Sequence, residues 1–232
     1  MPNARTLLVA LSHPDDEVGC AGTIAAHASQ GDRVVMLFLT HGEMTESLGP
    51  LAADEVARRR AVQAQEAAAI LGVSEVRLLD FPDTRVAFTP EANYRVAREI
   101  AGIAPHAVIT WGQAWQRGMR HPDHQATGDI VRAAVTIARM RRAVAPLEPH
   151  RGDCPIFTLR EAFSTLPEAA VDITRTQERA LELAAYYRGF VGWPDDAWLR
   201  ERQRKAGEPY GVAAAEVFDA WETPPGLMQT LI

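Results

Sequence analysis

The sequence predicts an α/β fold in which helices cover both faces of a mostly parallel sheet. Short apolar runs alternate with longer helix-like stretches four times over residues 1–142, a pattern typical of βαβ units. The runs are continuously apolar, which indicates strands buried on both faces. Hydrophobic residues make up 47% of the 232 residues and charged residues 23%, so the chain has enough apolar material for a sizeable core.

The expected elements are marked by their residue types. The predicted strands are apolar runs at residues 6–12, 33–40, 75–81 and 106–111. The predicted helices between and after them lie at residues 18–29, 52–71, 90–104 and 123–142. Gly72 suits the C-cap of the second helix, and Thr89 and Pro90 suit the N-cap and first position of the third. The sequence therefore predicts a Rossmann-like three-layer sandwich with right-handed crossovers.

The pattern changes after residue 142. Residues 145–155 contain three prolines and one glycine and are expected to form a loop. Two shorter strands and a helix capped by Thr174 are expected next, at residues 156–164, 169–173 and 174–188. The tail carries aromatic residues among Gly and Pro, namely Trp193, Trp198, Tyr210 and Trp221. We interpret residues 1–232 as a single domain with a core at about 5–175 and a small C-terminal cap at about 176–232.

Composition excludes several classes of protein. The formal net charge of −6 argues against a nucleic-acid partner, which usually requires a basic excess. Lys205 is the only lysine and lies outside any Gly-rich or apolar setting, which excludes P-loop and Schiff-base chemistry. Two cysteines cannot build a disulfide framework, so a cytoplasmic location is expected. The N-terminal apolar run is too short for a targeting signal or a membrane span, so no membrane association is expected.

Polar residues gather where each of the first four predicted strands ends. Ligands of open parallel sheets bind beyond the carboxyl ends of the strands, so these residues are expected to meet at one edge. The clusters are residues 13–16, residues 40–43, residues 81–83, and Trp111 followed by residues 121–124. Each cluster alone is weak evidence, but four at the same edge predict a functional site.

The first and last clusters contain the ligand types of a metal centre. Their His and Asp side chains can supply two imidazole nitrogens and one carboxylate oxygen, and three such ligands with one open position are typical of catalytic zinc. Asp15 and Asp16 are adjacent, so their side chains are expected to point in different directions. One can then bind the metal while the other lies beside the water that the metal activates, as a general base.

The sequence resembles the PIG-L/LmbE-like family of metal-dependent N-deacetylases. The matching motifs are Ser12-His13-Pro14-Asp15-Asp16-Glu17, Gly22-Thr23-Ile24 and His121-Pro122-Asp123-His124, with weaker matches at Phe81-Pro82-Asp83 and Val171-Asp172-Ile173-Thr174. The resemblance covers residues 5 to about 175 and extends more loosely to about residue 218. It implies hydrolysis of an N-acetyl group to give acetate and a free amine.

The resemblance also implies a role for each matching residue. His13, Asp16 and His124 would bind zinc, although iron or cobalt can occupy such sites. Asp15 would be the general base, and His121 would stabilise the oxyanion or protonate the leaving amine. Asp123 would orient a histidine through a hydrogen bond.

The family acts mostly on N-acetylglucosamine units within larger conjugates. Arg60 and Asp83 match positions that bind sugar hydroxyls, and Glu43 lies at the edge of the same site. The chain departs from many relatives at three places: Gln63 replaces a glutamate, Thr84 replaces a glycine, and Gly118-Met119-Arg120 stands where some relatives carry a tyrosine. The last of these departures argues against a tyrosine-assisted step. Met44-Thr45-Glu46-Ser47-Leu48 follows Glu43 where bacillithiol- and mycothiol-pathway relatives have a longer Gly/Thr pattern, so a different acceptor side of the substrate is expected.

Two alternatives remain beside the deacetylase. An amidase that removes a larger acyl group from a glucosamine or thiol-cofactor conjugate would use the same metal centre. A non-catalytic, metal-stabilised sugar-binding protein would also use the scaffold, but it predicts a degraded catalytic set. Relatives are often trimers or hexamers, so the resemblance implies a homo-oligomer whose partner is a small amino-sugar substrate.

Overall fold

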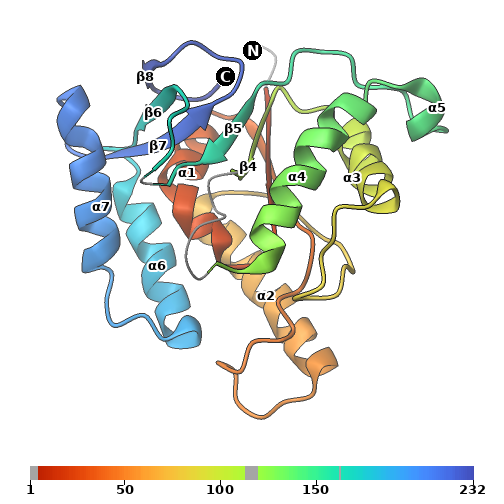
Figure 1. The fold of residues 1–232 in the computed structure, drawn as a ribbon. Coiled ribbons are helices and arrows are strands. Elements are labelled where there is room, and N and C mark those ends of the chain that lie inside the picture. Colours follow the sequence, from red (N-terminus) through yellow and green to blue (C-terminus); the bar gives the residue numbers. More distant parts are fainter. Residues whose placement is uncertain (1–4, 113–119, 162) are drawn as a thin grey trace.

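The computed structural model describes residues 5–112, 120–161 and 163–232. Its framework is an eight-stranded sheet of order β3-β2-β1-β4-β5-β7-β6-β8 (Figure 1). The strands are β1 (Thr6–Leu11), β2 (Arg33–Phe38), β3 (Glu75–Leu78), β4 (Ala107–Trp111), β5 (Ile156–Leu159), β6 (Glu168–Asp172), β7 (Ala215–Ala220) and β8 (Gly226–Met228). Strands β1 to β5 are mutually parallel, and β7 is antiparallel to both β5 and β6. The predicted mostly parallel sheet is confirmed.

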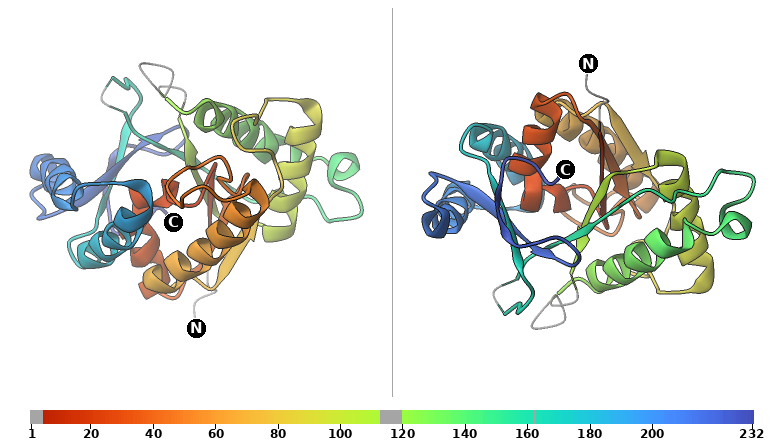
Figure 2. Two further views of the ribbon diagram at one scale, coloured as in Figure 1. Left: turned by 90° about the horizontal axis from the view of Figure 1, so that it is seen from below. Right: turned by 90° about the horizontal axis from the view of Figure 1, so that it is seen from above.

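Helices cover both faces of this sheet, and alternate side chains of β1 mark the two cores. Leu7 and Val9 belong to one core, whereas Leu8 and Ala10 belong to the other. The first core packs against α1 (Ala21–Ser29), α2 (Ala53–Leu71), α6 (Gln177–Val191) and α7 (Ala197–Gly207). The second packs against α3 (Pro90–Ile103), α4 (Pro122–Ile137) and α5 (Arg141–Val144). Figure 2 shows the two helical layers on opposite sides of the strands, so the three-layer architecture is confirmed.

The helix predicted over 123–142 is shorter in the structure and divides into α4 and α5. Residue Ala138 is fully buried, and its carbonyl oxygen accepts a hydrogen bond from the backbone N–H of His150 at 3.0 Å. The loop after α5 therefore packs back onto the end of α4. Local helix preference carries no information about this tertiary contact, so the helix was predicted to continue to residue 142.

The helix predicted over 174–188 begins three residues later than expected, at Gln177, and ends at Gly192, which has φ 73°. Thr174 does not cap it; its hydroxyl donates to an oxygen of Asp172 at 2.6 Å instead. The hydroxyl of Thr176 donates to the carbonyl oxygen of Gly22 at 2.8 Å, which ties the start of α6 to α1. The prediction of Thr174 as the cap was wrong because that side chain has a nearer partner.

The C-terminal residues do more than cover the core. Strand β7 lies inside the sheet, where it pairs with β5 on one side and β6 on the other. Phe218 at its centre is fully buried. The sequence analysis assigned no strand or helix to the tail beyond residue 188, and it therefore missed α7, the 3₁₀ turn Glu208–Tyr210, β7 and β8.

The order of the strands fixes where a ligand can bind. From β1 the chain builds outward through β2 and β3, and it then returns to place β4 on the other side of β1. The loops after β1 and β4 therefore diverge and leave a crevice at the carboxyl ends of these two strands, which is where such sheets bind ligands. Within the described residues, no helix is both long enough and apolar enough to cross a membrane.

Candidate metal centre and active site

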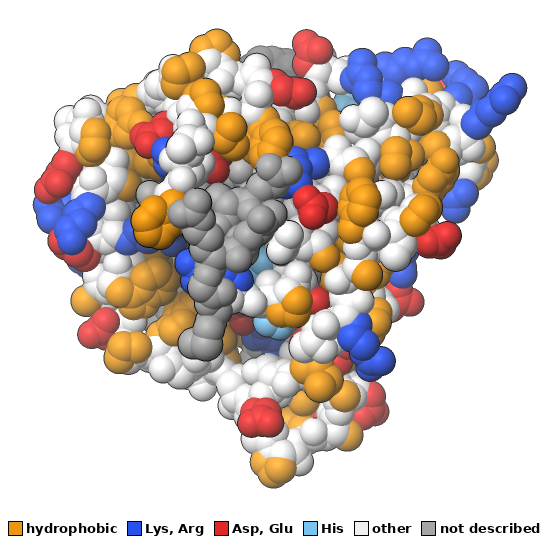
Figure 3. Space-filling model, in the orientation of Figure 1, with side chains coloured by type: hydrophobic (Ala, Val, Ile, Leu, Met, Phe, Trp, Pro, Cys, Tyr) orange, Lys and Arg blue, Asp and Glu red, His pale blue; other side chains and the backbone are white. Residues whose placement is uncertain are grey.

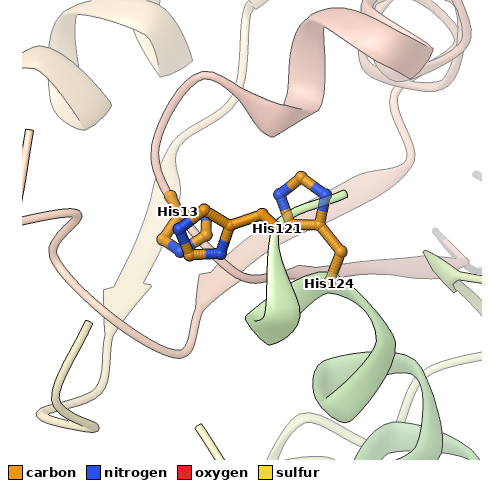
Figure 4. Close-up of side chains that lie close together, drawn as sticks. All are labelled: His13, His121 and His124. Carbon is orange, nitrogen blue, oxygen red and sulfur yellow. The ribbon is translucent and has the colours of Figure 1, made fainter. Parts of the chain in front are cut away.

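A cavity of about 360 Å³ opens at the carboxyl ends of β1 and β4. Histidine side chains are visible in a hollow of the face shown in Figure 3. Figure 4 shows His13, His121 and His124 reaching toward one another from the loop after β1 and the start of α4. The lining residues are His13, Asp15, Asp16, Gly42, Met44, Thr45, Arg60, Asp83, Thr84, His121 and His124.

His13 follows β1 directly and faces several carboxylates. Its Nε2 lies 3.2 Å from an oxygen of Asp123 and 3.2 Å from Oδ1 of Asp83. Burial lowers the pKa of His13, but hydrogen bonds with Asp123 and Asp16 outweigh it and raise the pKa to about 12. Three carboxylates surround this imidazole, so the site has an excess of negative charge that a bound dication would offset.

Asp16 is fixed by three donors on one oxygen. Oδ2 accepts from the backbone N–H of Ser12 and His13 at 3.0 Å each and from the indole of Trp111 at 3.2 Å. The other oxygen lies 3.1 Å from Nε2 of His124. Burial would raise the pKa of Asp16, yet the charge and hydrogen bond of His124 hold it well below its usual value. Asp16 is therefore a preorganised anion that links the first histidine motif to His124 of the second.

His124 lies in the first turn of α4 and stacks on Trp111, with ring centroids 3.8 Å apart and planes 9° from parallel. The close approach of α4 to the end of β4 depends on Gly128, one turn later, because a Cβ there would overlap the carbonyl oxygen of Trp111. Trp111 thus fixes both His124 and Asp16. The sequence analysis placed Trp111 at this edge but gave it no role.

Asp15 points away from Asp16. Its backbone is left-handed, with φ 105°, a conformation that non-glycine residues adopt at an energetic cost. Its Oδ2 accepts from Nη2 of Arg60 at 2.7 Å, and Arg60 also donates to the carbonyl oxygen of Pro14 and to Gln63. Burial raises the pKa of Asp15 to about 6, while the charge of Arg60 opposes the rise.

His121 is the N-cap residue of α4 and is about one-third exposed. Its Nδ1 accepts from the backbone N–H of Asp123 at 3.3 Å, so the proton of the neutral ring lies on Nε2. Burial, assisted by the charge of His13, lowers the pKa of His121. A neutral ring with an Nε2–H donor is therefore the form expected near neutral pH.

Asp123 and Asp83 are held by backbone donors from neighbouring loops. Asp123 is fully buried and accepts from the N–H of Thr84 at 2.8 Å and of Val86 at 3.1 Å.

Asp83 accepts on Oδ2 from the N–H of Met44 at 2.9 Å. Its Oδ1 is buried and lies 3.2 Å from Nε2 of His13. Glu43 lies beside the cavity and accepts from the N–H of Asp83 at 2.8 Å through one oxygen, while its other oxygen has no partner.

The donor set can hold a metal ion. The ring nitrogens of His13, His121 and His124 lie within 4.8 Å of one another. Nδ1 of His13 is 3.6 Å from Asp16, while Nε2 lies 3.2 Å from an oxygen of Asp123. This is the usual arrangement of a metal-binding histidine, whose other N–H is held by a carboxylate. Among the described residues, this compact group joins two of the predicted ligands, His13 and His124, with His121, and it can hold a divalent cation. Asp16, the third predicted ligand, is not part of the group.

A second group, His13, Asp83, His121 and Asp123, is equally compact. It fits a cation less well, because both oxygens of Asp123 already accept backbone hydrogen bonds. Its atoms are better explained as the outer partners of His13.

Most predicted site residues meet in one place. Asp123 and Glu43 stand directly behind the cavity that the other predicted residues line. Gly118 and Met119 stand where some relatives carry a tyrosine, and both lie outside the described residues. Tyr187 on α6 was not predicted as a site residue, because its helical, apolar surroundings in the sequence gave no signal. Its hydroxyl donates to Glu17 behind the cavity.

The chain is similar to known proteins over much of its length. A family model described as "PIG-L: GlcNAc-PI de-N-acetylase" matches residues 8–135. Diacetylchitobiose deacetylase of Thermococcus kodakarensis is 30% identical over 202 residues, which cover 84% of this chain and 73% of the relative.

Two solved structures resemble the fold over nearly the whole chain. The conserved protein TT1542 of Thermus thermophilus has a TM-score of 0.81 at 30% identity and covers 96% of each chain. N,N'-diacetylchitobiose deacetylase of Pyrococcus horikoshii, complexed with an inhibitor, has a TM-score of 0.81 at 27% identity and covers 94% of this chain and 84% of that one.

Proposed function

The chain belongs to the PIG-L family, and we propose that it is a zinc-dependent hydrolase that removes the N-acetyl group from an N-acetylglucosamine-type amino sugar or its conjugate. Relatives named as deacetylases of acetylated sugars support the reaction class. One observation carries the proposal to this chain. Beside the predicted ligands His13, Asp16 and His124, the carboxylate of Asp15 also lines the cavity and is not needed to bind the metal.

The bound metal would polarise the amide carbonyl and acidify water at the site. Asp15 accepts the proton of the attacking water, for which a pKa of about 6 is well suited. Arg60 holds this carboxylate in place at 2.7 Å. Nε2–H of His121 faces the cavity as a donor for the developing oxyanion. The proton then reaches the leaving amine, so that acetate and a free amine are released.

Substrate contacts are proposed for Asp83, Arg60 and Glu43. Oδ1 of Asp83 is buried beside Nε2 of His13 at 3.2 Å, and its second lone pair can accept from a sugar hydroxyl. Arg60 is only 2% exposed and already binds Asp15, so its contact with the sugar is secondary to holding the base. A neighbouring cavity of about 550 Å³ shares Met44 and Thr45 with the site and is lined by Glu43, which offers room for the rest of a conjugate.

Substitution of Asp15 tests the mechanism. Asp15→Asn should keep bound metal but lose acetate release by at least about 100-fold, because the amide cannot accept the proton. Metal content by mass spectrometry and acetate release from N-acetylglucosamine, its oligomers and its conjugates are the measurements. Asp80→Asn, at an exposed carboxylate outside the cavity, is the matched control. Undiminished turnover of Asp15→Asn would refute the proposed base.

The same substrate panel separates the alternatives. Faster hydrolysis of longer acyl groups than of acetyl groups would favour an amidase. No hydrolysis after metal add-back, with retained sugar binding, would favour a binding protein. Restoring the chelated protein with zinc, iron or cobalt identifies the active metal.

Three further proposals concern the whole protein. We propose a single domain, a homo-oligomer such as a trimer or hexamer, and a cytoplasmic location. Both cysteines, Cys20 and Cys154, are free and buried, which supports a reducing compartment. Light scattering measures the oligomer, and fractionation of cells locates the protein.

A further inference from the structure

Behind the cavity, the side chains of Glu17, Tyr187 and Arg60 form a ring of contacts that begins and ends at Asp15. The backbone N–H of Asp15 donates to Oε2 of Glu17 at 2.8 Å, and the hydroxyl of Tyr187 donates to Oε1 of Glu17 at 2.7 Å. The guanidinium carbon of Arg60 lies 6.0 Å from the ring centroid of Tyr187, and Nη2 of Arg60 reaches Asp15 at 2.7 Å. The ring thus holds both the backbone and the carboxylate of the same residue.

The members of this ring come from three distant parts of the chain and are buried. Glu17 and Tyr187 are completely inaccessible to solvent, and Arg60 is 2% exposed. Tyr187 lies on α6, which packs against α1 and α2. Buried polar groups that satisfy one another define a unique geometry, because breaking any link leaves an unpaired group in the interior.

The backbone of Asp15 explains why such a support is needed. At φ 105° the residue is in a left-handed conformation that an L-residue keeps only when the surroundings impose it. Its N–H is held by Glu17, and its side chain is held by Arg60. The 3₁₀ helix Asp16–Cys20 begins at the next residue, so the backbone angles of Asp15 fix the direction of its carboxylate relative to this helix.

We propose that Tyr187 and Glu17 are positioning residues, which hold Asp15 in its left-handed conformation and aim its carboxylate into the cavity. Neither residue lines the cavity, so neither contacts the substrate. The inference rests on the proposed function in one respect, namely that Asp15 is the base. A distant helix of the C-terminal region therefore sets the geometry of the reaction.

The kinetic test is Tyr187→Phe, which removes one hydroxyl and keeps the ring packing. We expect kcat for acetate release to fall by about 10- to 100-fold, the effect of a small misplacement of a reacting group. KM should stay within about twofold, and bound metal should be unchanged. Tyr186→Phe is the matched control, because its hydroxyl donates to Glu66 on the outside of α2 and has no contact with Asp15. It should keep the kcat of the parent.

A second measurement does not depend on turnover. Hydrogen exchange followed by mass spectrometry should show faster deuterium uptake in the peptide spanning residues 12–20 of Tyr187→Phe, but not of Tyr186→Phe, because the hold on the N–H of Asp15 is loosened. Glu17→Gln, which keeps an acceptor for that N–H, should retain more activity than Glu17→Leu.

Several results would overturn the inference. These are an unchanged kcat with unchanged uptake in Tyr187→Phe, a loss expressed only in KM, or an equal loss in Tyr186→Phe. If the parent protein releases no acetate from any substrate, the proposed function fails, while the uptake comparison still decides whether Tyr187 positions residue 15.

Discussion

Two neighbouring aspartates in this chain have opposite environments. Asp16 accepts hydrogen bonds from two backbone N–H groups and an indole and lies against His124, which lowers its pKa. Asp15 is turned away by its left-handed backbone, and burial raises its pKa to about 6. A permanently ionised carboxylate suits a metal ligand, and one with a pKa near neutrality suits a proton acceptor. Backbone geometry, hydrogen bonds and burial together give the two carboxylates their different environments.

Substitution of Asp123 tests the orientation of His13. Asp123→Asn weakens the hold on Nε2 of His13, and loss of such an outer partner typically costs about 10- to 100-fold in metal affinity. Titration of the metal-free protein with zinc against a chromophoric chelator measures the change. Asp129→Asn, on the same helix and paired with Arg132, is the control and should bind zinc like the parent. Equal affinities in the two variants would contradict the role of Asp123.

At the scale of elements, the site depends on how closely α4 approaches β4. His124 belongs to α4, and Trp111 is the last residue of β4. Their stacking requires that the helix and the strand almost touch at Gly128, where no side chain could fit. The start of α4 thus places His121 and His124 beside the end of β4, where the indole of Trp111 donates to Asp16. The candidate metal centre is a product of this packing.

Gly128→Ala should therefore destabilise the protein and disturb the site. Overpacking at a site without space costs about 1–3 kcal/mol. Urea unfolding followed by circular dichroism measures the loss, and zinc titration measures the effect on the site. Gly189→Ala on α6 is the control, since a Cβ there meets nothing within 4 Å and should stabilise the helix by about 0.5–1 kcal/mol. Parent-like stability of Gly128→Ala would show that α4 can move away without loss.

At the scale of the whole molecule, the C-terminal region closes back onto the first helix. The buried ring of His27 on α1 lies 2.8 Å from Asp32 through Nδ1 and accepts from the backbone N–H of Leu231 through Nε2 at 3.1 Å. The ring therefore needs to be neutral, with its proton on Nδ1, to join residues 204 positions apart.

This contact predicts how stability depends on pH. Burial lowers the pKa of His27 below its usual value of 6.5, and Asp32 opposes the shift only in part. The neutral form is favoured in the folded state, so its stabilisation is complete above about pH 6.5 and is lost as pH falls through the lowered pKa. The free energy of unfolding should drop as pH falls below about 6.5, and less steeply in His27→Gln. Identical slopes would contradict the role of His27.

The two histidine motifs were readable from the sequence because their chemistry is local. The spacing within residues 13–16 and 121–124 reports ligand types, and their place after apolar runs reports the sheet edge. Element ends such as those of α4 and α6 were misplaced because tertiary hydrogen bonds from His150 and Thr176 decide them. Strand β7 was missed because a short run in an aromatic tail gives no sign of its two pairing partners.

The α/β class, the sheet edge that carries the candidate site and the candidate metal ligands were predictable from the sequence, because alternation and motif composition are properties of short segments. Three features required the folded chain: the contact of Nε2 of His13 with Asp123, the turn of Asp15 away from Asp16, and the hydrogen bond from Tyr187 to Glu17 across 170 positions. These are relations between segments brought together by folding, and hydrogen-bond geometry exists only once they meet.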